Sequence, residues 1–474
     1  MKLQHLRFLA LTIWTLCIAV IFNTGNVHAQ QKPVTPQPLA ELQQQFVDLG
    51  FGMFIHYNIP TYMEDDWADP DASPDIFNPK KLNTDQWAKA AKSAGMTYGC
   101  LTTKHHSGFA IWDTKTTPYN VMNSPLKRDV VKEYVNSFRK QGLKVMLYYS
   151  ILDTHHKLRP GQITPTHIKM VKDQLTELLT NYGEISALII DGWDAPWSRI
   201  SYDDVPFEEV YNLIKSIQPN CLVMDLNAAK YPAEALFYTD IKSYEQGAGQ
   251  HISKDSNRLP ALSCLPINQN WFWKPSFPNT PVKKANELVN NMLIPLNKAY
   301  CNFILNVAPN RDGLIDDNVI AELKEIGQLY KRPESFPKLP AAAAPIISSN
   351  LARKHPANSS WSDDMALMDF ATDDNFTTSW VSHSGIANPW FEVDLGKEVP
   401  FNMVVITEEK ANVSAYTLEY FANDKWHLLT EGNDASRIKI HRFERVWGDK
   451  LRVRFTGFSS PPAITEIGVY QERR

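Results

Sequence analysis

One stretch of the sequence places a carboxylate at the end of a short apolar run. Ala187-Leu-Ile-Ile runs directly into Asp191, and Gly192 and Trp193 follow. A short unbroken apolar run is typical of a parallel strand that is buried on both faces. Catalytic residues of parallel-strand barrels gather at the C-terminal strand ends, so a carboxylate there would lie at the mouth of a pocket. Asp191 is therefore our first candidate for a catalytic group.

Other expected strands also end in polar or aromatic residues. These residues are His56, His105 and His106, Tyr148 and Tyr149, Asp225, and Glu245. A lone strand-end histidine is more often structural, but several such groups at one barrel mouth favour an active site. Trp67, Trp193 and Trp271 lie in the loops after strands and are candidate pocket walls. For Asp225 we expect a structural role, because strand-end aspartates often cap a helix or accept a loop N–H.

Two carboxyl groups at one pocket would suit glycoside hydrolysis. One must be ionised to attack the anomeric carbon, and the other must protonate the departing oxygen and later deprotonate water. The pocket must therefore separate the pKa values of the two groups. Asp191 suits the nucleophile of a retaining enzyme, with nearby imidazole or indole N–H groups keeping it ionised.

The elements around these residues alternate between strand and helix. Expected strands cover 50–58, 98–106, 144–150, 187–191, 221–225, 237–245, 261–267 and 300–306, and expected helices cover 39–49, 85–94, 130–141, 167–182, 207–218, 282–296 and 319–329. This alternation predicts an α/β fold, a (β/α)₈ TIM-like barrel over residues 30–331. No clear helix separates the sixth and seventh strands, so we expect an irregular barrel there.

The pattern changes after an alanine- and proline-rich stretch, residues 332–347, which we interpret as a linker. Residues 348–474 contain short alternating segments separated by Gly, Asn, Asp and Pro. This pattern predicts a C-terminal all-β jelly-roll sandwich.

The N-terminus has the form of a signal peptide, residues 1–29, with cleavage expected after Ala29. Lys2 and Arg7 flank an apolar run that is short for a membrane span. Removing residues 1–29 takes away two basic residues and no acids, leaving 46 basic against 52 acidic residues, a net charge of −6. We therefore expect a periplasmic or extracellular protein with no membrane span and no nucleic-acid partner. The four remaining cysteines are widely spaced in apolar settings, which favours buried free thiols.

The barrel sequence resembles the α-L-fucosidases of glycoside hydrolase family 29. The similar stretches are Gly52-Met-Phe-Ile-His56, Thr103-Lys-His-His-Ser-Gly-Phe109, Leu147-Tyr-Tyr-Ser150, Ile190-Asp-Gly-Trp193 and the segment from Asn302 to Gly313. The resemblance implies a retaining double displacement through a covalent fucosyl-enzyme on Asp191. It also implies sugar contacts from His56, His105 and His106, a pocket lined by Trp67 and Trp193, and no cofactor. We extend the expected sugar-binding set to Tyr149 and Trp271. The expected substrate is a fucosylated oligosaccharide or glycoconjugate.

The sequence departs from this family at the acid/base position. Where many members have a glutamate in a Trp-Glu-x-Cys-like segment, this chain has Leu262 in Ala261-Leu-Ser-Cys264. Leucine cannot carry a proton, so Glu245 is our first candidate for the acid/base, Asp66 the second and Glu64 the third. The alternatives are a related α-glycosidase acting on a fucose-like sugar such as an α-L-galactoside, or a carbohydrate-binding protein on a degenerate barrel.

Residues 348–474 resemble the discoidin-like, or factor 5/8 type C, domains with a galactose-binding-like fold. The similar stretches are Ala371–Trp380, Trp390–Gly396 and Leu451–Tyr470. In that family the turn at Asp373 and Asp374 can hold a structural Ca²⁺. The sequence leaves open whether this domain binds sugar or supports the barrel.

Overall fold

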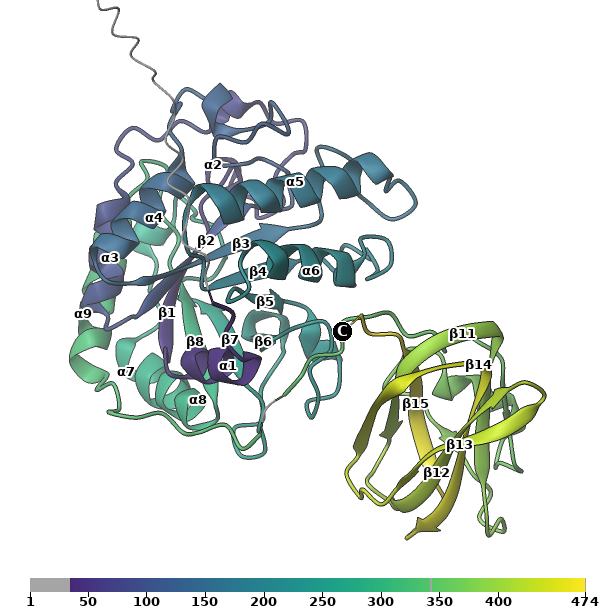
Figure 1. The fold of residues 1–474 in the computed structure, drawn as a ribbon. Helices are drawn as coiled ribbons and strands as arrows, with labels where there is room; N and C mark the ends of the chain where they lie inside the picture. The colour runs from purple at the N-terminus through teal and green to yellow at the C-terminus, as the bar shows by residue number, and fades with distance from the viewer. Residues whose placement is uncertain (1–34, 342, 474) are drawn as a thin grey trace, which may run out of the picture. The chain divides into compact units, whose positions relative to one another are not determined.

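The computed structural model describes residues 35–341 and 343–473, so the expected signal peptide lies outside the described residues. The first part of the chain forms a sheet of eight parallel strands in the order β5-β4-β3-β2-β1-β8-β7-β6 (Figure 1). The strands are β1 (Phe51–Ile55), β2 (Tyr98–Lys104), β3 (Lys144–Ser150), β4 (Ala187–Asp191), β5 (Leu222–Asp225), β6 (Lys242–Glu245), β7 (Ala261–Pro266) and β8 (Cys301–Asn306). The chain therefore has the predicted TIM-like architecture.

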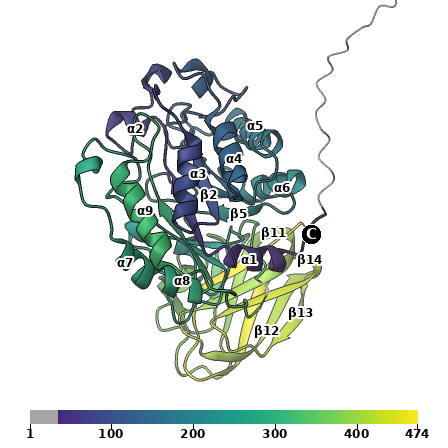
Figure 2. The ribbon, with the colours of Figure 1, turned by 90° about the vertical axis from the view of Figure 1, so that its left-hand side faces the viewer.

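Helices cover the outside of this sheet. They are α3 (Thr84–Ser93), α4 (Val130–Lys140), α5 (Pro165–Asn181), α6 (Phe207–Ile217), α7 (Ala285–Glu287), α8 (Ile294–Lys298) and α9 (Asp317–Leu329). Helices α3 and α9 lie side by side (Figure 2). Helix α1 (Leu39–Val47) contributes Leu42 and Phe46 to the cluster inside the barrel, and the Asn302 side chain donates a hydrogen bond to the Phe46 carbonyl. This helix therefore closes the barrel at the end opposite the strand C-termini.

The barrel interior is filled by alternate residues of the strands. On β4, Ala187 and Ile189 belong to the inner cluster, whereas Leu188 and Ile190 pack in the outer cluster beneath the helices. Successive side chains of a strand point to opposite faces, so Asp191 continues the inward row of Ala187 and Ile189. Asp191 therefore lies inside the barrel at its C-terminal end.

Two expected elements differ in the structure. The sixth strand begins at Lys242 rather than at 237, because Phe237 forms a bridge with Ile346 and Tyr238 has a positive φ of 55°. The expected helix 282–296 is divided into α7, a π-helical turn over Leu288–Leu293, and α8. Pro295 has no N–H to donate to an α-helical ladder, which accounts for the change of register before it.

No α-helix separates β6 from β7, as predicted, but these two strands pair regularly, and the irregular junction lies between β5 and β6. Only short 3-10 turns stand between β5 and β6 and between β6 and β7 within the described chain. The strand order ends at β5 and β6, which approach each other through single contacts such as the Asp240 N–H donating to the Val223 carbonyl at 2.8 Å. The barrel is therefore closed less regularly between these two strands than elsewhere.

The C-terminal part is an antiparallel all-β domain. Its strands are β9 (Ala357–Ser359), β10 (Trp380–Val381), β11 (Trp390–Glu408), β12 (Val413–Ala422), β13 (Lys425–Gly432), β14 (Ile438–Phe458) and β15 (Ala463–Tyr470). They follow the order β10-β15-β11-β14-β12-β13, with β9 paired to β11, around a core that contains Trp380, Phe391 and Phe455. Register shifts interrupt the long β11–β14 ladder after Asp394 and after Phe401, where the strands bend.

Two smaller expectations concern cysteines and membrane spans. Cys100, Cys221, Cys264 and Cys301 are buried free thiols, as predicted. Among the described helices, none has both the length and the apolar character needed to cross a bilayer.

Candidate active site

A cavity of about 310 Å³ opens at the C-terminal ends of the barrel strands. It is lined by Phe54, His56, Asp66, Trp67, His105, His106, Asp191, Trp197, Leu226, Glu245, Gly247, Ala248 and Trp271. These residues come from the ends of β1, β4 and β6 and from the loops that follow β1, β2, β4, β5, β6 and β7. The structure thus brings together eight of the ten residues that the sequence nominated for the site.

Asp191 lies buried in this cavity with both carboxylate oxygens held. The Tyr148 hydroxyl donates to Oδ2 at 2.6 Å, and the Asn227 side-chain amide donates to Oδ1 at 2.9 Å. Burial raises the pKa of Asp191, and the hydrogen bonds from Tyr148, Asn227 and the Gly192 N–H oppose that rise. A phenol, an amide and a backbone N–H therefore favour the ionised form, where the sequence suggested imidazole or indole groups.

His56 is a neutral hydrogen-bonding group. Its Nδ1 lies 2.8 Å from Oδ1 of Asn306, whose Nδ2 donates to the Trp271 carbonyl at 2.7 Å. Because Asn306 uses its amide group as the donor to Trp271, its Oδ1 must accept from His56, which places the imidazole proton on Nδ1. Burial lowers the pKa of His56 to about 3, so Nε2 remains an unprotonated acceptor. A sugar hydroxyl could donate to this nitrogen.

His106 follows the same pattern beside Asp191. Its Nδ1 lies 2.8 Å from Oγ of Ser150, which donates to the Leu152 carbonyl at 3.0 Å, so the imidazole is the donor to Ser150. Burial lowers the pKa of His106 to about 3, and its Nε2 lies 3.9 Å from Oδ2 of Asp191. His106 Nε2 and Asp191 Oδ2 are both acceptors, so a donor such as a sugar hydroxyl could bind between them. The neighbouring ring of His105 also has a pKa lowered by burial, and it lies 3.9 Å from the His106 ring centre.

Glu245 accepts fewer hydrogen bonds than Asp191. It ends β6, and its Oε1 accepts a hydrogen bond from Nε1 of Trp271 at 3.1 Å. Burial and then the charge of Asp191 raise the pKa of Glu245 to about 7, and the Trp271 hydrogen bond only partly opposes this rise. Glu245 is therefore placed and tuned to hold a proton near neutral pH.

The other acid/base candidates are engaged elsewhere. Asp66 lines the cavity, but its Oδ1 forms an ion pair with Lys274 at 3.2 Å. Glu64 lies on an exposed turn and pairs with Arg311 at 3.0 Å. Leu262 is buried near the start of β7, opposite Ser243, and does not line the cavity. The position that departs from the family pattern is thus a core position of this barrel, and Cys264, two residues later, lies opposite Glu245.

Two expected sugar contacts are corrected by the structure. Tyr149 points outward, and its hydroxyl donates to Gln174 of α5 at 2.7 Å, because neighbouring residues of a strand face opposite sides. Tyr148 is the inward residue of this pair. Trp193 is fully buried behind the cavity, where its Nε1 donates to the Val205 carbonyl at 2.9 Å. It supports the loop after Asp191 instead of lining the cavity.

The sequence reasoning missed Asn227 and Trp197. Asn227 follows β5 by two residues, and its backbone N–H donates to Oδ1 of Asp225 at 3.0 Å, which fixes the amide that holds Asp191. Asp225 is buried and also accepts from the Tyr202 hydroxyl at 2.5 Å, in agreement with the structural role we expected. The sequence signal for Asn227 was its place directly after a strand end. The signal for Trp197 was its place in the loop after Asp191.

The C-terminal domain shows no comparable site in its described residues. Asp373 accepts from the Thr378 hydroxyl at 2.8 Å, and Asp374 pairs with Arg353 at 3.7 Å. Between residues 35 and 473, leaving out 342, no group of three His, Cys, Asp or Glu side chains is arranged to hold a metal ion. The Ca²⁺ expected near Asp373 stays a prediction.

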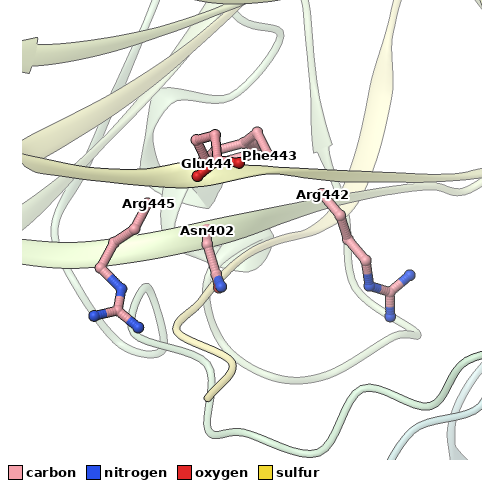
Figure 3. A pocket seen from close by; sticks show the side chains of 5 residues that line it. All are labelled: Asn402, Arg442, Phe443, Glu444 and Arg445. Atoms are coloured by element: carbon pink, nitrogen blue, oxygen red, sulfur yellow. The ribbon is translucent and has the colours of Figure 1, made fainter. Parts of the chain in front are cut away.

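A hollow of about 550 Å³ on this domain is lined by Asn402, Arg442, Phe443, Glu444 and Arg445 (Figure 3). The two arginine side chains lie apart on either side of Asn402. Arg442 pairs with Glu472 at 3.4 Å, and Asn402 exchanges hydrogen bonds with the Glu472 backbone. Because its polar groups diverge or are already bonded, this hollow lacks the convergent groups of a ligand site.

The barrel cavity defines the class of protein. A buried carboxylate that accepts several hydrogen bonds, a second carboxyl with a pKa near 7, and neutral histidines at a barrel mouth are the parts of a glycoside hydrolase site. Comparison with known proteins agrees. The α-L-fucosidase family model matches residues 21–333, and the F5/8 type C domain model matches residues 354–467. The chain belongs to the α-L-fucosidase family, glycoside hydrolase family 29.

Individual relatives and structures support this assignment. Alpha-L-fucosidase 1 of Arabidopsis thaliana is 27% identical over 492 residues, covering 97% of this chain and 92% of that protein. A glycoside hydrolase 29 family member from an unknown rumen bacterium has a TM-score of 0.51 at 25% identity, covering 94% of this chain and 78% of that one. Alpha-L-fucosidase isoenzyme 1 from Paenibacillus thiaminolyticus shares the fold, with a TM-score of 0.53 at 23% identity over 92% of this chain and 100% of that one.

Proposed function

We propose that this protein is an exported, retaining exo-α-L-fucosidase that removes terminal α-L-fucose from oligosaccharides or glycoconjugates. The observation that carries the proposal is the presence in one cavity of Asp191, whose carboxylate accepts hydrogen bonds from Tyr148 and Asn227, and Glu245, whose pKa is raised to about 7. The form of the N-terminal sequence supports export. The family assignment supports fucose as the sugar.

In the first step the Asp191 carboxylate attacks the anomeric carbon and forms a glycosyl ester. Glu245 gives its proton to the departing oxygen, and the bond between that oxygen and the sugar breaks. The neutral ester no longer carries the Asp191 charge, which is one of the two causes of the raised pKa of Glu245. Glu245 can therefore remain ionised as the base of the second step.

In the second step Glu245 removes a proton from water, and the resulting oxygen nucleophile attacks the same carbon. Asp191 leaves as a carboxylate, which the Tyr148 and Asn227 hydrogen bonds stabilise. Two inversions give fucose with the configuration of the substrate. The neutral imidazoles of His56 and His106 offer unprotonated Nε2 atoms as acceptors for sugar hydroxyls.

The test is the hydrolysis of an aryl α-L-fucoside by the wild type and by the variants Asp191→Ala and Glu245→Ala, with and without azide. Asp191→Ala should abolish turnover. Glu245→Ala should be slow without azide, and azide should restore activity and yield α-fucosyl azide, because a small anion can attack the β-linked glycosyl-enzyme without a general base and inverts it to the configuration of the substrate. Asp66→Asn is the matched control, since it changes another carboxylate of the same cavity.

Different outcomes would redirect the assignment. If Glu245→Ala keeps wild-type rates and Asp66→Asn does not, the acid/base is Asp66. If the wild type cleaves an aryl α-L-galactoside and leaves the fucoside intact, the enzyme acts on a fucose-like sugar instead. If neither substrate is cleaved, the protein is a carbohydrate-binding barrel.

A further inference from the structure

Two exposed tryptophans meet at the rim of the cavity. Trp67 is 47% exposed and Trp197 is 40% exposed, and their rings approach edge to face with centres 5.4 Å apart. Within residues 35–341 the only other large apolar side chain with comparable exposure is Leu329 on α9. Exposed large apolar side chains that cluster at one place indicate a binding surface.

The two indoles continue the wall of the catalytic cavity. Trp67 stacks on the His106 ring at 4.8 Å between ring centres, and Trp197 lies 4.3 Å from the same ring. His106 in turn faces the nucleophile. The aromatic surface therefore extends from the buried position of the reacting sugar outward to solvent.

The loop that carries Trp197 is braced. The Asp194 N–H donates to the Ile200 carbonyl at 2.6 Å, the Arg199 N–H donates to the Ala195 carbonyl at 2.9 Å, and the Ser198 hydroxyl donates to the Gly192 carbonyl. The Asp194 carboxylate also pairs with Lys230. A large apolar side chain presented to solvent on a cross-braced loop is prepared for a ligand, because little side-chain or loop ordering remains to oppose binding.

We propose that Trp197, with the exposed part of Trp67, forms the binding site for the sugar residue to which the fucose is attached. The occupant is a pyranose that lays its apolar C–H face on the Trp197 indole. Asp191 lies at the closed end of the cavity, so the bond that breaks must point toward the open rim, and the leaving sugar meets the tryptophans there. This inference rests on the proposed fucosidase activity and adds its preference for a sugar leaving group.

The test compares two substrates that differ only in the leaving group. α-L-Fucosyl fluoride leaves a single atom, which is too small to reach the rim, whereas a fucosyl disaccharide places a pyranose there. Trp197→Ala should lower kcat/KM for the disaccharide about tenfold and change kcat/KM for the fluoride less than about twofold. The ratio of the two values is independent of the fraction of correctly folded enzyme, so partial misfolding does not obscure it.

Two further variants sharpen the comparison. Trp197→Phe keeps an aromatic face and should retain most of the disaccharide activity. Trp361→Ala removes a tryptophan that is 65% exposed on the C-terminal domain and should leave both values unchanged. The disaccharide is the one that the wild type cleaves fastest among the natural fucosyl linkages.

The possible results are separable. Equal losses on both substrates would show that Trp197 contacts the fucose itself, and an unchanged disaccharide rate would show that it contacts no sugar. A wild type that cleaves the fluoride but no disaccharide would also refute the proposed sugar-binding site at Trp197 and Trp67, while leaving the fucosidase assignment intact. If the wild type cleaves none of these substrates, the proposed function itself fails.

Discussion

The Trp271 indole donates its Nε1 hydrogen to Oε1 of Glu245, and its backbone carbonyl accepts from Asn306, the residue that orients His56. A single residue in the loop after β7, Trp271, thus bonds both to Glu245, the proposed proton donor, and to Asn306, which orients His56. The indole N–H favours the ionised carboxylate and opposes the rise in the pKa of Glu245.

Replacing Trp271 by Phe removes this donor and should raise the pKa of Glu245 further. The group that must be protonated for the first step would then stay protonated to higher pH, so the alkaline limb of kcat/KM should move to higher pH. Profiles of kcat/KM against pH for the wild type and Trp271→Phe measure this shift. A limb that moves to lower pH would contradict the assigned direction of the hydrogen bond.

In the wild type, kcat/KM should fall as pH rises through about 7, because Glu245 loses the proton that the leaving oxygen requires. The variant Glu245→Gln cannot titrate, so its residual activity on an aryl fucoside with a good leaving group should lose this limb. The measurement is the pH profile of both proteins on the same substrate. Retention of the limb in the variant would assign the titration to another group.

Tyr148→Phe removes the donor to Oδ2 of Asp191 without changing the ring. The ionised nucleophile loses one of its hydrogen bonds, so its pKa should rise and the acidic limb of kcat/KM should move to higher pH. We expect kcat to fall by about tenfold to a hundredfold, the cost of about 1.4 to 2.7 kcal/mol for a hydrogen bond to a charged group. Tyr149→Phe is the matched control, since Tyr149 bonds to Gln174 outside the cavity and should leave the limb in place.

The ion pair between Lys104 and Asp153 is fully buried, with a distance of 3.1 Å. The Lys104 charge and the His156 hydrogen bonds hold the pKa of Asp153 below its usual range despite burial. Because the folded pKa lies below the unfolded one, this stabilisation is present above about pH 4 and is lost as pH falls below it. Lys104→Met should lower the free energy of unfolding at pH 7 by about 3 to 5 kcal/mol, since it leaves a buried charge without its main partner.

Denaturant unfolding of the wild type and Lys104→Met at pH 7 and at pH 4 measures the loss in the free energy of unfolding and the direction in which pH changes it. The loss relative to the wild type should shrink at the lower pH. The double variant Lys104→Met/Asp153→Leu should recover much of the stability, because neither charge is then buried alone. A double variant as unstable as the single one would show that packing, and not charge, causes the loss.

The strand ends that carry the chemistry could be predicted because each follows a recognisable apolar run. The direction in which a strand residue points is harder to predict from the sequence than the position of the strand end. Tyr148 and Tyr149 are adjacent in a strand that is buried on both faces, so both sides of the strand read as apolar and the pattern does not show which tyrosine faces inward. The structure settles this by placing Tyr148 on Asp191 and Tyr149 on Gln174.

Loop residues were less predictable than strand residues for a physical reason. Trp193 and Trp197 lie four residues apart in one loop, but a left-handed Asp194, with φ of 45°, turns the first into the core and leaves the second at the rim. Hydrogen bonds between backbone groups of the loop fix this outcome, and they leave no periodic trace in the sequence. The break of the expected helix before Pro295, by contrast, could have been predicted, because proline cannot donate to the helical hydrogen-bond ladder. We nevertheless expected one continuous helix because of the apolar pattern of residues 282–296.

The neutral imidazoles have a consequence for which sugars the pocket admits. His56, His105 and His106 bring no positive charge to the cavity near neutral pH, and the Lys274 ammonium is matched by Asp66. The cavity therefore carries the negative charge of Asp191, joined by Glu245 as pH rises above about 7, and no lining residue in the described chain supplies a cation to balance it. A uronic or sialic acid would bring a second anion into this poorly solvated space, whereas an uncharged deoxysugar would not. We therefore expect the site to disfavour acidic sugars by electrostatic repulsion.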